Sequence, residues 1–214
     1  MASEIVFPNS KSHKLLGALK FIFAPLMFMV GPCVVYGREQ LPKEGGVIVL
    51  INHLSDSDPM IVQNASSRGI HFMAKSELFT IPILKQWMIF WGGFPVKRGV
   101  PDRASIRLAV ELAKAGRVVG IFPEGKLSED GKLQEIREGA ALIIRMSEVP
   151  VICLGIKNTN RIVPYGSLIP RPAFCKVTAH WGEPRSFNKD ASNEEITSWI
   201  EAEFRRLIPE PPNN

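Results

Sequence analysis

Short apolar runs recur along the chain, and turn-forming or polar residues separate them from one another. Runs of this length, bounded by glycine, proline and polar clusters, are typical of β-strands. We therefore expect strands at residues 33–36, 47–51, 70–74, 94–97, 118–122, 149–156 and 175–181.

Segments with helical periodicity lie between these runs. Asp58 precedes Pro59, which suits the first position of a helix ending near residue 67, so we expect Asp58 to be its N-cap. Further helices are expected at residues 83–90, 102–115 and 133–147, and after the capping box Ser192–Glu195. Strands that alternate with helices predict an α/β fold, with a mixed, largely parallel central sheet covered by helices. A single domain would span residues 33–208, followed by a disordered tail at residues 209–214.

The N-terminal residues carry an apolar segment at 15–32, and basic side chains surround its start. A spanning helix needs about 20 apolar residues, but Lys20 interrupts this run and Pro25 would kink a helix. We expect residues 1–32 to be a membrane-associating segment, amphipathic or dipping into one leaflet, which places the protein at the cytoplasmic face of a membrane. A true span and a helix buried in the core are the alternatives.

The composition is that of an ordinary globular protein, with 45% hydrophobic residues and a net charge of +5. A basic chain suits nucleic acid, an anionic membrane surface or phosphorylated substrates. Two tyrosines and no basic stripe interleaved with aromatic residues argue against nucleic acid as a partner. The cysteines, Cys33, Cys153 and Cys175, form no CxxC pair, so we expect no disulfide framework, no zinc site and a reducing compartment.

His53 follows the apolar run at residues 47–51, at the end of a strand where open α/β sheets place their ligands. On a helix, positions 53 and 58 would point about 140° apart, so His53 meets Asp58 only if the residues between them form a loop. A neutral imidazole can take the proton of an attacking hydroxyl, and a carboxylate on its other nitrogen fixes the tautomer. The plain alternative is a helix cap and a strand-end histidine. The other histidines show no ligand spacing with His53, so no metal is expected.

The segment Gly120–Lys126 nearly fits the phosphate-loop pattern G-x-x-x-x-G-K-[ST]. Leu127 lacks the magnesium-binding hydroxyl, and the first glycine lies inside an apolar strand, so we reject that interpretation. We instead expect the strand to end in a tight turn, Pro123–Gly125, on the same edge of the sheet as His53. Glu124 is then a candidate to bind an acceptor hydroxyl or to orient a substrate, and a plain surface turn is the alternative.

Basic residues follow two of the expected strands. Lys97 and Arg98 lie in the glycine-containing segment 92–99, and the guanidinium of Arg98 offers a planar fork suited to phosphate. Lys75 follows the strand at residues 70–74. Each is a candidate for binding an anionic substrate, although a solvated surface charge is the commoner role for such residues.

The order of these motifs resembles the glycerolipid acyltransferase family, and in particular bacterial 1-acylglycerol-3-phosphate acyltransferases, over residues 36–185. The matching segments are residues 36–42, Asn52-His53 with Ser55 and Asp58, residues 75–79 with Pro82, residues 92–99, 122–125, 149–151 and 182–184. Each segment is short and weakly specific, but their order and spacing together are specific. The chain departs from the family at Lys126-Leu127, where Thr-Arg is common, which affects the identity of the acceptor more than the type of reaction.

The resemblance implies that His53, oriented by Asp58 in an HX4D motif, deprotonates the free hydroxyl of a lysophospholipid. That oxygen would attack the thioester of acyl-CoA or acyl-carrier protein, with backbone N–H groups stabilising the oxyanion. The expected acceptor is 1-acylglycerol-3-phosphate and the product phosphatidic acid, with no cofactor beyond the acyl donor. The residues carried over as substrate-binding are Arg98, Lys97, Lys75, Asn52, Glu124 and Gly125. An acyl-thioester hydrolase with the same dyad and a non-catalytic lipid-binding membrane protein are the alternatives.

Overall fold

The structure is a computed structural model of the chain, and it describes residues 33–97, 102–167, 171 and 175–209. The predicted membrane-associating segment at residues 1–32 therefore lies outside the described residues, as do Arg98 and residues 210–214 of the predicted tail.

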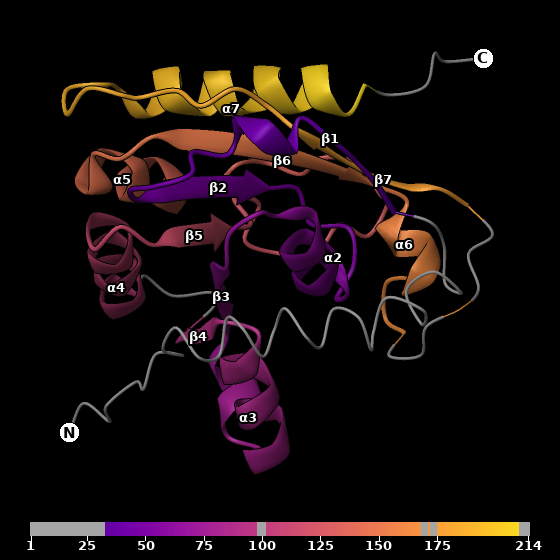
Figure 1. Ribbon diagram of the computed structural model, residues 1–214. Coiled ribbons are helices and arrows are strands. Elements are labelled where there is room, and N and C mark those ends of the chain that lie inside the picture. Colours follow the sequence, from indigo (N-terminus) through magenta and orange to yellow (C-terminus); the bar gives the residue numbers. More distant parts are fainter. Residues whose placement is uncertain (1–32, 98–101, 168–170, 172–174, 210–214) are drawn as a thin grey trace.

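Seven strands of the described chain form one sheet in the order β1-β7-β6-β2-β5-β3-β4 (Figure 1). The strands from β6 to β4 in this order run parallel to one another, while β7 runs antiparallel to β6 and carries β1 at the edge. Their bounds are β1 Cys33–Tyr36, β2 Val47–Ile51, β3 Ile70–Lys75, β4 Gly93–Val96, β5 Val118–Ile121, β6 Val151–Lys157 and β7 Val177–Trp181. The predicted α/β fold with a mixed, largely parallel sheet is thus confirmed.

Helices cover the sheet on both faces. Their bounds are α2 Asp58–Ala65, α3 Pro82–Phe90, α4 Arg103–Lys114, α5 Glu138–Ser147, α6 Thr159–Ile162 and α7 Asn193–Leu207, with short 3-10 helices η1 Arg38–Gln40 and η2 Ser76–Phe79. Successive side chains of a strand point to opposite faces, and in β2 they enter two different cores. Ile48 and Leu50 join α4, α5 and α7, whereas Val47, Val49 and Ile51 join α2. Because all five residues of β2 are buried, its sequence is a continuous apolar run.

The expected caps of two helices are present. The side chain of Asp102 accepts a hydrogen bond from the backbone N–H of Ser105 at 3.1 Å, and Ser192 accepts one from Glu195 at 3.0 Å. The helix predicted at residues 133–147 is shorter than expected and begins only at Glu138. The residues before it are not helical because their backbone N–H groups bind the turn after β5 instead, one of them from Arg137 to the carbonyl oxygen of Pro123 at 2.8 Å.

The helix α3 extends beyond the edge strand β4, away from the rest of the sheet (Figure 1). None of its described side chains is buried, although most of them are apolar. Ile83 is 82% exposed, and Ile81, just before the helix, is 50% exposed. Within the described part of the chain, no helix is both long and apolar enough to cross a bilayer.

Candidate active site

His53 lies just beyond the carboxyl end of β2, near the middle of the sheet. Leu50 pairs with Ile121 of β5, and Ile51 pairs with Leu154 of β6. Continuing these registers places His53 between the turn that follows β5 and the last residues of β6. The structure thus brings the predicted histidine and the predicted Glu-Gly turn to one edge of the sheet, as expected for parallel strands.

The side chains of His53 and Asp58 meet across a loop. Nδ1 of His53 lies 3.0 Å from Oδ2 of Asp58, and both side chains are buried, with 6% and 0% exposed. The same oxygen accepts the backbone N–H groups of Leu54 at 2.7 Å and Ser55 at 2.9 Å. Three donors thus converge on one carboxylate oxygen, which fixes both the loop and the orientation of the imidazole.

The predicted role of Asp58 as an N-cap is wrong. Ser57 occupies the N-cap position of α2, and Asp58 is the first helical residue. Its carboxylate turns back toward the loop, because the backbone N–H groups of Leu54 and Ser55 and the ring of His53 all donate to it. Bonding to His53 and capping α2 are therefore alternatives for this carboxylate, and the structure shows only the first.

The imidazole ring is also held by stacking. The ring of His53 lies on Phe122, with 3.9 Å between centroids and 21° between planes. Phe122 in turn faces Phe72 of β3, with 6.1 Å between the centroids. Because Nδ1 is bonded to Asp58, Nε2 on the other side of the ring is the nitrogen left to accept a proton from a substrate.

Glu124, predicted to contact substrate, has both carboxylate oxygens bonded to backbone in this structure. One oxygen accepts the N–H of His53 at 2.8 Å and the other that of Gln134 at 2.7 Å. The side chain is 1% exposed, and burial raises the pKa of Glu124 although these two bonds lower it. The backbone carbonyl of His53 accepts the N–H of Ser128 at 2.8 Å, so the segment after β5 holds both backbone groups of His53.

Asn52 is likewise engaged with backbone. Its Oδ1 accepts the N–H of Ile156 at 2.8 Å, and its Nδ2 donates to the carbonyl oxygen of the same residue at 3.0 Å. Because Asn52 is fully buried, this pair of bonds attaches the end of β2 to β6 directly before the histidine.

Gly125 forms the predicted tight turn after β5. Its N–H donates to the carbonyl oxygen of Phe122 at 3.0 Å, and its φ of +67° lies in the left-handed region. An added Cβ would meet only a side-chain atom of Arg137, at 3.4 Å, so the backbone conformation rather than lack of space favours glycine here.

Two of the predicted cations, Lys75 and Lys97, lie at the same edge of the sheet as His53. Lys75 ends β3, is half exposed and lies 3.8 Å from Glu77. Lys97 follows β4 and is exposed, and its backbone N–H donates to Asp102 at 2.8 Å. Three strand spacings of about 4.8 Å separate β2 from β4, so Lys97 starts about 14 Å from His53. The neighbouring Arg98 lies outside the described residues.

One contact of the loop between His53 and Asp58 was not predicted. The hydroxyl of Ser55 donates to the carbonyl oxygen of Val163 at 3.0 Å, which attaches the loop to the segment after α6. No sequence motif marked residues 158–163, so the pattern gave no signal of this contact. Among the described residues, no group of His, Cys, Asp and Glu side chains is arranged to hold a metal ion.

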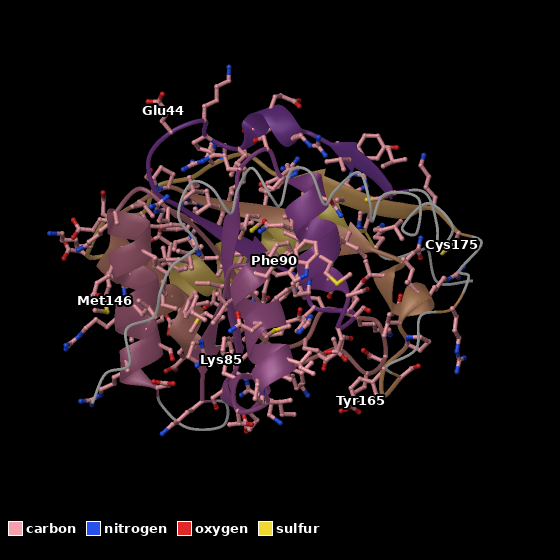
Figure 2. The ribbon with its side chains drawn as sticks, turned by 60° about the horizontal axis from the view of Figure 1, so that its bottom comes forward. Glu44, Lys85, Phe90, Met146, Tyr165 and Cys175 are labelled. Carbon is pink, nitrogen blue, oxygen red and sulfur yellow. The ribbon has the colours of Figure 1, made fainter. Side chains whose placement is uncertain are left out.

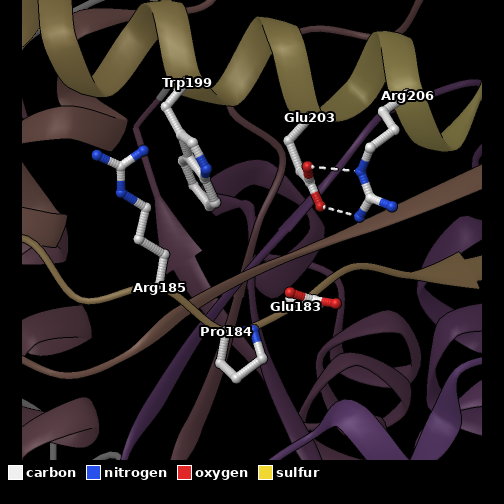
Figure 3. Close-up of a pocket in the computed structure, with 6 residues that line it drawn as sticks. All are labelled: Glu183, Pro184, Arg185, Trp199, Glu203 and Arg206. Atoms are coloured by element: carbon white, nitrogen blue, oxygen red, sulfur yellow. Dashed lines mark hydrogen bonds and ion pairs between the residues drawn. The ribbon is translucent and has the colours of Figure 1, made fainter.

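A pocket of about 490 Å³ lies elsewhere, between α7 and the segment after β7 (Figure 3). Arg206 forms an ion pair with Glu203 inside it, and Arg185 pairs with Glu195 beside it. Arg185 bridges to Val151, at the amino end of β6, whereas His53 is level with the carboxyl end of that strand. None of the residues that line the pocket is among those that contact His53, so the pocket is separate from the site around that residue.

Comparisons with known proteins agree on one family. Residues 33–157 match the family described as Acyltransferase. A 1-acyl-sn-glycerol-3-phosphate acyltransferase of Bacillus subtilis is 34% identical over 137 residues, which are 63% of this chain and 65% of that protein. A chloroplastic enzyme of the same name from Brassica napus, BAT2, is 32% identical over 136 residues, covering 62% of this chain and 39% of its own length.

A solved structure is similar over nearly the whole chain. The crystal structure of the 1-acyl-sn-glycerophosphate (LPA) acyltransferase PlsC from Thermotoga maritima has a TM-score of 0.75 and 26% sequence identity. The similarity covers 95% of this chain and 82% of that one. By contrast, the matches to the two curated sequences above span less than two thirds of those proteins.

Proposed function

Because this chain belongs to the acyltransferase family, we propose that it transfers a fatty acyl group from acyl-CoA or acyl-carrier protein to the free hydroxyl of a lysophospholipid. The proposed acceptor is 1-acylglycerol-3-phosphate, which would become phosphatidic acid, and the names of the relatives support that choice. The observation that carries the reaction type is the buried pair of His53 and Asp58, 3.0 Å apart at the carboxyl edge of the sheet.

In the proposed mechanism, Asp58 holds the proton on Nδ1 of His53 and leaves Nε2 as the base. Nε2 takes the proton of the acceptor hydroxyl while the oxygen attacks the thioester carbonyl. The tetrahedral intermediate then expels the thiolate, which recovers the proton from the imidazolium. Asp58 stabilises that imidazolium without itself being protonated, as in other carboxylate–histidine pairs.

The backbone N–H groups nearest the base are already bonded. Those of Leu54 and Ser55 donate to Asp58, and that of His53 donates to Glu124. An oxyanion hole needs donors that are free to face the developing charge. We therefore assign the stabilisation of the oxyanion to groups outside residues 53–55, whose amides orient the catalytic loop instead.

The proposed binding site for the phosphate of the acceptor consists of the basic residues that follow β3 and β4. Arg98 is the proposed principal contact because its guanidinium binds phosphate in a bidentate manner. Lys97 and Lys75 support this assignment by their places on the same edge as His53. Phosphate on that side would leave the substrate hydroxyl free to reach toward β2.

Residues 1–32 are proposed to hold the enzyme at the cytoplasmic face of a membrane, where the lysophospholipid resides. The apolar run at residues 15–32, preceded by basic side chains, supports this role. Deleting residues 1–32 is expected to weaken sedimentation of the protein with membranes. A truncated chain that sediments as fully as the intact one would contradict the assignment.

Thiol release from acyl-CoA, measured with and without 1-acylglycerol-3-phosphate, tests the proposed function. We expect release that depends on the acceptor, together with formation of phosphatidic acid detected by mass spectrometry. The His53→Ala variant should lose at least about 100-fold in rate while remaining folded. Release that proceeds equally without the acceptor would favour an acyl-thioester hydrolase instead.

A further inference from the structure

The N-terminal end of α3 is the most apolar exposed feature of the described chain. Ile83 is 82% exposed and Ile81 is 50% exposed, with Pro82 exposed between them. Few large apolar side chains are this exposed in the described chain, and these two flank a single proline in the sequence. Burying an isoleucine side chain is favourable, so these residues favour a partner that removes them from water.

The topology places this end of α3 at the catalytic edge of the sheet. The chain leaves the carboxyl end of β3 at Lys75, passes through η2 and enters α3 at Pro82. Two successive crossovers run in the same direction across the sheet. The first goes from β2 through α2 to β3, and the second from β3 through α3 to β4. Since such crossovers are right-handed, α3 lies on the same face as α2. His53 belongs to that face too, because it stacks on Phe122, which packs against the core under α2.

Cations accompany the exposed apolar residues. Lys85 is exposed on α3, two residues after Ile83, and Lys97 is exposed at the end of the neighbouring strand β4. Figure 2 shows Lys85 and Phe90 on α3 in the centre of the view and Met146 well to one side. An exposed apolar tip, with Lys85 one helical turn after Ile81 and Lys97 at the end of the neighbouring strand, complements the interfacial layer of a bilayer that carries anionic lipids.

We propose that the N-terminal end of α3, Ile81 to Ile83, inserts into the interfacial layer of an anionic lipid bilayer, with Lys85 facing the headgroups. This inference rests on the proposed function, because it places the membrane beside the edge where the lysophospholipid would enter. A protein partner fits less well, because two isoleucines supply far less than the roughly 800 Å² that a stable interface buries on each partner. The contact is additional to residues 1–32 and lies in the folded domain itself.

The test uses the full-length chain and vesicles of phosphatidylcholine, with or without phosphatidylglycerol. Ile83→Asp should weaken binding to the mixed vesicles by about tenfold, because it replaces an inserted side chain with a charge. The matched control is Met146→Asp on α5, an exposed apolar residue on the opposite face of the sheet, at 43% exposure. It should bind vesicles as the native chain does. Lys85→Glu should weaken binding to the anionic vesicles and leave the weak binding to pure phosphatidylcholine unchanged.

Other results would overturn the inference, because they would show that something other than a bilayer covers the N-terminal end of α3. Unchanged vesicle binding of Ile83→Asp excludes insertion of this tip. Unchanged binding with a lower melting temperature would show that another segment of this chain covers the tip, and a change in sedimentation coefficient without vesicles would indicate a second copy. Activity toward a short-chain acceptor dissolved as monomers separates this inference from the proposed function. Ile83→Asp should retain that activity, whereas absence of transfer by the native chain would refute the proposed function alone.

Discussion

Asp58→Asn is the substitution that separates the proposed catalytic role of His53 and Asp58 from their structural role most sharply. The asparagine oxygen can still accept the three N–H groups that now converge on Oδ2, from His53, Leu54 and Ser55. Each bond loses the contribution of the charge, roughly 1 kcal/mol, since bonds to charged groups contribute about 1.5–3 kcal/mol and neutral ones about 0.5–1.5 kcal/mol. The new amide nitrogen takes the place of Oδ1, a buried atom that makes no hydrogen bond within the described residues.

Together these losses predict a free energy of unfolding lower by about 3 kcal/mol, partly offset because a buried charge is removed. A domain of ordinary stability, about 5–15 kcal/mol, would remain folded. The acyl-transfer rate should fall further, by about 10²–10⁴, because the imidazolium loses its counter-charge and the tautomer is no longer fixed. Urea denaturation and the rate of thiol release in the presence of acceptor measure the two effects separately.

Gln63→Leu is the matched control. Gln63 on α2 is also buried, and it exchanges two hydrogen bonds with the backbone of Ile70, at 2.9 and 3.3 Å. Ile70 is the first residue of β3, at the amino edge of the sheet, so this variant should lose about 1–3 kcal/mol of stability without losing activity. If Asp58→Asn were as active as Gln63→Leu, the assignment of Asp58 to the catalytic dyad would be refuted.

Three further outcomes are expected. Glu124→Gln should lower the free energy of unfolding by about 1–3 kcal/mol, because its NH₂ must face one of two backbone donors; a rise in the acceptor KM with no loss of stability would instead assign Glu124 to the substrate. Arg98→Ala should raise the acceptor KM much more than the donor KM, and equal increases would count against the phosphate assignment. Burial raises the pKa of both the Cys33 and the Cys153 thiols, but only Cys153 is buried from reagents, so alkylation should modify the exposed Cys33 and spare Cys153 until the chain unfolds. Rapid labelling of Cys153 in the native protein would disprove its burial.

The sheet was predictable because its strands are apolar at nearly every position and end at clear turns. The limits of the helix at residues 133–147 were not, because helical periodicity continues through Leu133 and Ile136 although the backbone there is not helical. The N–H of Gln134 binds Glu124 instead of a helical carbonyl. A bond of this kind, between a backbone N–H and a side chain from another segment, cannot be predicted from the local pattern of apolar and polar residues.

The members of the candidate site were predictable, but the partners of their side chains were not. The meeting of His53 and Asp58 follows from the loop between them. The sequence predicted that Asn52 and Glu124 bind substrate. In the structure, Asn52 instead bonds to backbone 104 residues away in sequence, and Glu124 to backbone 71 residues away. A sequence pattern can place a polar residue at the edge of a sheet, but only the fold decides whether another strand reaches its donors and acceptors first.

The hydrogen bonds that hold the loop from His53 to Asp58 affect how fast its amide protons exchange with solvent. Loop amides usually exchange their protons quickly, because water replaces their bonds at little cost. Here the amides of His53, Leu54 and Ser55 all donate to the buried carboxylates of Asp58 and Glu124. Those carboxylates belong to the segments that follow the two central strands β2 and β5. The bond from His53 ties the loop to the segment after β5, while those from Leu54 and Ser55 close the loop on its own carboxylate. We therefore expect these three protons to exchange more slowly than those of a loop whose amides face water, so the loop should keep the imidazole of His53 in one orientation.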